Sequence, residues 1–230
     1  MAESRVGVLG GTFNPIHLGH LVLAESFREG LALDRIVFVP AGTPPHKPAG
    51  GIAPALHRYA MASIAVAGHA PFTVSDVEVR RAGASYSVDT LEVLAGEWPG
   101  TRLFFLMGSD TFLDLPTWRT PERLGTWATL AVGHRAGSDF DPAAPAARAV
   151  LERLGRAVWR RVPATPDPAA ALEAVAPGEV LLVDTRSIPV SAREIRGLLA
   201  GGHSVHYLVP PAVADYIAQH RLYAEPPVGS

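Results

Sequence analysis

Two imidazole side chains follow a pair of glycines in the segment Gly10-Gly11-Thr12-Phe13-Asn14-Pro15-Ile16-His17-Leu18-Gly19-His20. Glycines let backbone N–H groups approach an anion closely, and the start of a helix adds further N–H donors and a positive dipole end. His17 and His20 stand three positions apart, so they face the same side of a first helical turn. This combination fits a reaction in which negative charge develops on phosphate oxygens.

The same residues allow two other interpretations. A glycine turn with two surface or capping histidines needs no ligand, and histidine pairs of this spacing are common. A zinc site of the metalloprotease kind is disfavoured, because it needs histidines four positions apart with a glutamate beside the first. The place of the turn, between a predicted strand and a predicted helix, favours phosphate binding.

Strands and helices alternate along the chain. Continuous apolar runs predict strands at residues 5–9, 36–39, 72–75, 102–107, 129–132 and 180–183. Helical periodicity predicts helices at residues 18–29, 56–67, 88–97 and 145–154, and two more that open near Ser191 and Pro211. Apolar strands between helices predict an α/β fold: a doubly wound, Rossmann-like parallel sheet with helices on both faces. Such a fold binds ligands at the carboxyl ends of its strands.

The pattern predicts a single domain over residues 1–230, with a small helical part at about 187–223. Within residues 136–178 we expect the helix 145–154 and then an irregular, proline-rich connection. No apolar run approaches the ~18 residues of a membrane span, and the N-terminus does not resemble a signal peptide. We therefore expect a cytoplasmic protein without a membrane partner.

The composition excludes several classes of function. The 230 residues carry a formal net charge of −2, so no global field attracts nucleic acid or an anionic membrane. The absence of cysteine excludes disulfides, thiolate catalysis and cysteine zinc sites. Among the 20 basic residues Lys47 is the single lysine, which draws attention to the loop that carries it.

Several segments resemble one known family. Gly11-Thr12-Phe13-Asn14-Pro15-Ile16-His17-Leu18-Gly19-His20 resembles the signature of the adenylyl- and cytidylyltransferase superfamily, with its H-x-G-H core. The bacterial nicotinate-nucleotide adenylyltransferases are similar at four further segments: Pro44-Pro45-His46-Lys47, Ser85-Tyr86-Ser87-Val88-Asp89-Thr90-Leu91, Phe105-Leu106-Met107-Gly108-Ser109-Asp110 with Leu115 and Trp118 after it, and Val190-Ser191-Ala192-Arg193-Glu194-Ile195-Arg196. The matches occur in family order over nearly the whole chain.

The resemblance implies a nucleotidyltransferase fold and the transfer of the adenylyl group of ATP to nicotinate mononucleotide, with release of pyrophosphate and with Mg²⁺ carried by ATP. It implies catalysis by His17 and His20 and no dedicated metal ligands. The ATP-binding residues would be Gly11, Thr12, Phe13, Gly108, Asp110, Ser191, Arg193 and Arg196. The mononucleotide-binding residues would be His46, Lys47, Ser87 and Trp118.

Three positions depart from the family pattern. Asn14 stands where aspartate is common, which disfavours a metal-ligand role there, and Ala192 and Arg193 replace two hydroxyl residues. Ser191 and Glu194 form a capping-box pattern that would begin a helix with or without a ligand. The alternatives left open are another acceptor (nicotinamide mononucleotide or phosphopantetheine), a non-catalytic nucleotide-sensing module, a metal-dependent hydrolase, and a homo-oligomer in place of a monomer.

Overall fold

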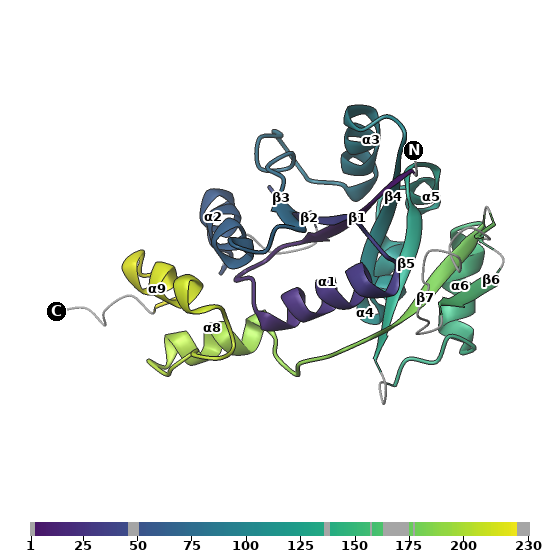
Figure 1. Cartoon of the computed structure of the whole chain (residues 1–230). Helices are drawn as coiled ribbons and strands as arrows, with labels where there is room; N and C mark the ends of the chain where they lie inside the picture. The colour runs from purple at the N-terminus through teal and green to yellow at the C-terminus, as the bar shows by residue number, and fades with distance from the viewer. Residues whose placement is uncertain are drawn as a thin grey trace.

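The computed structural model describes residues 3–45, 51–135, 139–156, 158–162, 175–176 and 178–224. Within them lies one seven-stranded sheet in which every pair of neighbours is parallel, in the order β3-β2-β1-β4-β5-β7-β6. Figure 1 shows this sheet with helices on both sides. Its strands are β1 (Ser4–Gly11), β2 (Arg35–Pro40), β3 (Phe72–Val74), β4 (Thr101–Gly108), β5 (Thr129–Arg135), β6 (Val158–Val162) and β7 (Glu179–Thr185).

The helices of the described residues cover both faces of the sheet. The α-helices are α1 (Leu18–Gly30), α2 (Ala55–Val66), α3 (Ser87–Glu97), α4 (Ser109–Asp114), α5 (Leu124–Trp127), α6 (Pro145–Arg153), α8 (Ala192–Ala200) and α9 (Pro211–Gln219). Two short 3₁₀ helices, η1 (Leu115–Thr117) and η2 (Pro121–Arg123), lie between α4 and α5.

Two buried clusters explain why the strand sequences are apolar throughout. Successive side chains of a strand point to opposite faces. In β4, Phe104 and Leu106 pack into a cluster with α1, α2, α8 and α9. Leu103, Phe105 and Met107 pack into a second cluster with α3, α4, α5 and α6. Because both faces are covered, both sets of positions must be apolar, and the predicted doubly wound α/β fold is confirmed.

The strand order creates a switch point beside β1. The chain runs outward from β1 to β2 and β3 and then returns to β4 on the other side of β1. The parallel register pairs Leu9 of β1 with Leu106 of β4, so both strands end at the same edge, at Gly11 and Gly108. Ligands of open α/β sheets bind at such a point.

The end of the described chain packs on the side of α1 and α2. Ile195 of α8 and Val213 and Ile217 of α9 belong to the same buried cluster as Phe27 of α1. Figure 1 shows α8 and α9 at the end of the molecule where α2 lies, and β6 with α6 at the other end. The extent of the domain as a single unit over 1–230 stays a prediction.

One stretch was interpreted wrongly from the sequence. The expected helix is present as α6, but Val158–Val162 forms the edge strand β6 instead of an irregular connection. Its sequence Val-Trp-Arg-Arg-Val has no continuous apolar run, because an edge strand with one neighbour need not be buried on both faces. Arg160 of β6 bonds Glu179 of β7 through its Nε at 2.8 Å.

Candidate active site

The turn between β1 and α1 is tight and leaves two of its backbone N–H groups without a protein acceptor in the described part of the chain. A Cβ on Gly11 would lie 3.0 Å from the ring of Phe13, and Phe13 itself has a φ of +46°. The Phe13 ring is buried against Phe38, with ring centroids 5.9 Å apart. Within the described residues, the backbone N–H groups of Thr12 and Phe13 donate to no protein acceptor. They are therefore available to an anion.

His17 and His20 lie together, as their spacing predicts. Their rings stack with centroids 3.7 Å apart and planes 28° apart. The backbone N–H of His17 donates to Nδ1 of His20 at 3.2 Å. Because Nδ1 of His20 accepts this bond, the neutral ring carries its proton on Nε2. An edge contact with Phe13, at 5.0 Å between centroids, supports the His20 ring from another side.

His17 is the buried member of the pair. Its side chain is 7% exposed, and its Nδ1 has no hydrogen-bond partner in the described part of the chain. Burial lowers the pKa of His17 to about 4, because a charged imidazole would lose its hydration there. At neutral pH His17 is therefore uncharged and can act by hydrogen bonding and by packing.

Gly19 lets a distant segment approach the two histidines. A Cβ at this position would lie 3.0 Å from the His17 ring and 3.1 Å from Cγ1 of Val190. Val190 directly precedes Ser191, the N-cap of α8, so the missing side chain at Gly19 lets the start of α8 lie close to the N-terminus of α1. In this chain, steric crowding by His17 and Val190 therefore explains why the third position of the H-x-G-H core is a glycine.

The N-terminus of α8 has the predicted capping box. Glu194 N–H donates to Oγ of Ser191 at 3.1 Å, and Ser191 N–H donates to Oε2 of Glu194 at 3.4 Å. Arg196 donates to the backbone carbonyl of Asn14 at 2.8 Å, which ties α8 to the turn after β1. Arg193 is exposed at the same helix end. The structure therefore places Ser191 and Arg196 beside the β1–α1 turn.

Asn14 has a structural role that the sequence analysis missed. This residue is 5% exposed. Its Nδ2 donates to the carbonyl of Gly51 at 2.9 Å, and its Oδ1 accepts from Ala53 N–H at 3.0 Å and from the Tyr223 hydroxyl at 2.8 Å. An amide can donate and accept at once, whereas a carboxylate can only accept. The departure from aspartate is therefore explained by hydrogen bonding.

Arg58 was also missed, and it lies under the same turn. Its guanidinium is almost fully buried and donates to three backbone carbonyls, those of Ala53, Thr12 and Gly42, at 2.8 to 2.9 Å. Burial lowers the pKa of Arg58, but a guanidinium stays charged in proteins. A fixed positive charge thus holds the carbonyl of Thr12, in the turn that carries the N–H groups of Thr12 and Phe13.

At the end of β4, Gly108 is the N-cap of α4 and Asp110 lies exposed in the first turn. No side-chain bond caps this helix, so Asp110 does not act as its cap. A Cβ on Gly108 would lie 2.5 Å from Oδ1 of Asp110, so the carboxylate folds back over the strand end. Both residues therefore lie at the carboxyl edge next to β1.

Two of the residues expected to bind the mononucleotide, Ser87 and Trp118, lie on the face of the sheet opposite to α1. Ser87 is the first residue of α3, after the N-cap Tyr86. Trp118 is half-buried, with its ring at 6.3 Å from that of Phe105 in β4. Tyr86 and Trp118 pack against the same buried cluster. The loop that carries His46 and Lys47 lies outside the described residues, so their role stays a prediction.

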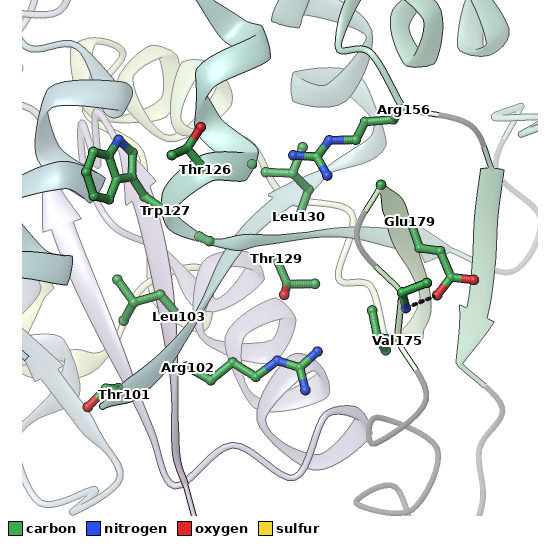
Figure 2. Close-up of a pocket in the computed structure, with 14 residues that line it drawn as sticks. Thr101, Arg102, Leu103, Thr126, Trp127, Thr129, Leu130, Arg156, Val175 and Glu179 are labelled. Atoms are coloured by element: carbon green, nitrogen blue, oxygen red, sulfur yellow. Dashed lines mark hydrogen bonds between the residues drawn. The ribbon is translucent and has the colours of Figure 1, made fainter. Parts of the chain in front are cut away.

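A hollow among the described residues lies away from this edge. Figure 2 shows this hollow, of about 320 Å³, lined by Thr101, Thr129 and Glu179 at the amino ends of β4, β5 and β7. Glu179 accepts there from Ala176 N–H at 2.8 Å. In a parallel sheet this edge is opposite to Gly11 and Gly108. No residue predicted for the site lies in it.

In the described ranges, no group of three or more histidine, aspartate or glutamate side chains is placed to hold a metal ion. No helix of this part of the chain is long and apolar enough to cross a membrane.

The class of protein follows from comparison with known sequences. The family model described as cytidylyltransferase-like matches residues 8–198, which include the end of β1, the histidine pair and most of α8. The chain therefore belongs to the cytidylyltransferase-like nucleotidyltransferases.

Individual relatives identify the particular family within this class. The chain is 41% identical over 220 residues to a protein of Thermomicrobium roseum named probable nicotinate-nucleotide adenylyltransferase, covering 96% of this chain and 92% of that protein. It is also 41% identical over 221 residues to a protein of the same name from Geobacter sulfurreducens, covering 96% and 98%. It is thus a member of the nicotinate-nucleotide adenylyltransferases, and the predicted family is confirmed.

Solved structures support the fold at lower identity. The structure of Plasmodium falciparum nicotinic acid mononucleotide adenylyltransferase complexed with NaAD superposes with a TM-score of 0.69 at 19% identity, covering 96% of this chain and 97% of that one. A putative nicotinate-nucleotide adenylyltransferase of Vibrio parahaemolyticus gives a TM-score of 0.62 at 15% identity, covering 97% of both chains.

Proposed function

We propose that this chain transfers the adenylyl group of ATP to nicotinate mononucleotide, giving nicotinate adenine dinucleotide and pyrophosphate. The observation that carries the proposal is the stacked pair His17–His20 beside the free N–H groups of Thr12 and Phe13, at the switch point of the sheet. The family of the chain supplies the reaction class.

The proposed chemistry needs no nucleophile from the protein. The 5′-phosphate of the mononucleotide is already ionised, so it can attack the α-phosphorus of ATP while the bond to the β-phosphate breaks. The protein must hold two polyanions in line and offset the charge on the α-phosphate and on the leaving pyrophosphate. Donors fixed before the reaction do this without reorganisation.

We assign the roles by position. The Nε2–H of His20 donates to the α-phosphate, and neutral His17 supports the ring of His20. Ser191, Arg193 and Arg196, at the N-terminus of α8, hold the β- and γ-phosphates. Asp110 accepts from a ribose hydroxyl. Ser87 and Trp118, on the opposite face, receive the pyridine ring. His46 and Lys47, which lie outside the described residues, receive the acceptor's phosphate.

We propose that Mg²⁺ enters as part of the substrate MgATP. Such an ion keeps several waters and binds through substrate phosphates rather than through an all-protein cage. This fits the donor set at the site, where guanidinium, imidazole and N–H groups prevail. We also propose the cytoplasm as the location, because both substrates are polyanions that lipid excludes.

An acceptor panel tests the proposed function. ATP and Mg²⁺ are incubated with nicotinate mononucleotide, nicotinamide mononucleotide, phosphopantetheine or glycerol 3-phosphate, and pyrophosphate is measured. We expect the fastest release with nicotinate mononucleotide. Release with phosphopantetheine alone would favour the alternative acceptor, and binding of ATP without release would favour a sensing module. His20→Ala serves as the control for turnover by this site.

A further inference from the structure

Arg119 joins two segments between which the acceptor's ring is expected to lie. Its guanidinium carbon is 4.7 Å from the centroid of the Tyr86 ring. Its Nη1 is 3.4 Å from Oδ2 of Asp89, in the first turn of α3. Arg119 directly follows Trp118, and Tyr86 directly precedes Ser87. The side chain of Arg119 therefore reaches from the Trp118 segment to the start of α3.

The segment that carries Arg119 is anchored in the core. The backbone N–H of Trp118 donates to the carbonyl of Leu115 at 2.9 Å, and Leu115 is fully buried. The Trp118 ring rests on Phe105 of β4. The anchored Trp118 and the contacts of Arg119 with Tyr86 and Asp89 hold the guanidinium near one place, although 55% of the side chain is exposed.

The carboxylate of Asp89 would repel another carboxylate that is bound nearby. Two like charges a few Å apart repel each other, and the repulsion is largest where little water intervenes. Asp89 stands two residues after Ser87, the candidate donor to the acceptor's ring substituent. Arg119 is the cation that contacts Asp89, so it offsets this repulsion. A neutral carboxamide in the same place would be affected little by either charge.

We propose that Arg119 is a specificity-determining residue of the acceptor site, which rests on the proposed function. By pairing with Asp89 and lying on Tyr86, it allows an anionic ring substituent to bind at the start of α3. The contact is a half-exposed ion pair, and such pairs add little to folding stability. Removing the charge of Arg119 should therefore leave the fold intact. The change should appear in the choice between the two acceptors.

The test compares acceptors in three variants: Arg119→Gln, Arg119→Lys and the double variant Arg119→Gln/Asp89→Asn. We measure kcat and KM for nicotinate and nicotinamide mononucleotide. Both acceptors carry the same phosphate, so the ratio of their kcat/KM values isolates the ring substituent. We expect Arg119→Gln to lower this ratio about tenfold, because the KM for the nicotinate form rises. A tenfold change is the size expected when one unit charge acts across several Å of intermediate dielectric.

The other two variants separate charge from shape. Arg119→Lys keeps the charge without the planar contact, so most of the preference should remain. In the double variant the repelling carboxylate is also gone, so the ratio should recover most of its parent value. Because the interaction is partly screened, the effect of Arg119→Gln on the ratio should shrink as ionic strength rises to about 1 M.

A matched control is available in the same chain. Arg153 and Glu122 form an ion pair of nearly the same length, 3.5 Å, and of nearly the same exposure. Arg153→Gln should leave the acceptor ratio unchanged. An equal loss for both acceptors in Arg119→Gln, or an unchanged ratio, would overturn the inference while leaving the proposed function intact. A parent protein that adenylates neither mononucleotide would instead overturn the proposed function.

Discussion

At the scale of single residues, the two stacked histidines have different environments and therefore different roles. His20 is partly exposed, and its Nδ1 is occupied by a backbone N–H, which directs its proton to Nε2. His17 is buried and uncharged at neutral pH. This difference fits the roles proposed above, in which His20 donates to substrate and His17 supports the ring of His20.

His20→Ala should therefore lower kcat by about 10²–10³, the loss typical of a fixed donor to developing negative charge. ATP should still bind, because the backbone N–H groups and the arginines remain. Steady-state kinetics and the Kd of ATP measure the two effects. His203→Ala, at an exposed histidine, is the control. Unchanged turnover in His20→Ala would remove this residue from the chemistry.

His17 predicts a pH dependence of stability. Its pKa in the fold, about 4, lies below the 6.5 of an unperturbed histidine. The unfolded chain therefore binds more protons between these values, and stability present above pH 6.5 is lost as the pH falls toward 4. Between pH 7.5 and 5 the loss should be about 2 kcal/mol.

Urea unfolding of the parent and of His17→Gln at both pH values measures this loss. The variant lacks the titrating group, so its free energy of unfolding should fall less over the same interval. Equal losses in parent and variant would contradict the buried, uncharged state of His17.

At the scale of elements, the five strands inside the sheet and the edge strand β3 were predicted from the sequence, whereas the other edge strand, β6, was not. The apolar run predicted at residues 102–107 is found as β4 (Thr101–Gly108), and that at 180–183 as β7 (Glu179–Thr185). Burial on both faces requires such runs, so the pattern is strong. β6 has one neighbour and two arginines in five residues, and its sequence carries no comparable pattern.

In the candidate site, too, features that depend on residues close in sequence were predicted, and contacts between residues far apart in sequence were not. The histidine pair and the capping box at Ser191 depend on spacings of three residues, which the sequence displays directly. Asn14 bonds Tyr223, 209 positions away, and Arg58 bonds Thr12, 46 positions away. Contacts over such separations are set by the packing of whole elements, so no local pattern indicates them.

The N-terminus of α8 gives a prediction about ATP. If the guanidinium of Arg193 replaces the hydroxyl groups of the family pattern, Arg193→Thr should weaken ATP binding about tenfold, as expected for loss of one charge-assisted hydrogen bond. Adding Ala192→Ser should restore part of the affinity. Calorimetric titration with a non-hydrolysable ATP analogue measures both. Undiminished affinity in Arg193→Thr would mean that this side chain points to solvent.

At the scale of the whole molecule, the strand order brings distant segments to one edge. β1 and β4 are neighbours in the sheet although β2 and β3 lie between them in sequence. The histidine turn and the Gly108–Asp110 segment therefore meet at the carboxyl edge. The net charge of −2 is small, so binding of two polyanions must depend on local donors such as Arg193 and Arg196.

Acceptor choice follows from this arrangement. A pocket of N–H and O–H donors favours a carboxylate and opposes the N–H groups of a carboxamide. Opposed donors cost ~1–3 kcal/mol each, so two of them give a preference of about 10² or more in kcat/KM for the nicotinate form. Ser87→Ala should narrow that preference, measured with both mononucleotides. Equal rates for the two acceptors in the parent would show that the pocket does not distinguish the substituents.

The position of the bond that breaks tests the account most directly. ATP labelled with radioactive phosphorus at the α or the γ position is incubated with the protein, Mg²⁺ and nicotinate mononucleotide, and the products are separated. We predict that the α label appears in the dinucleotide and the γ label in pyrophosphate, in equal amounts and only when the acceptor is present. Release of the γ label as orthophosphate without acceptor, or no transfer of the α label, would contradict adenylyl transfer at the His17–His20 site.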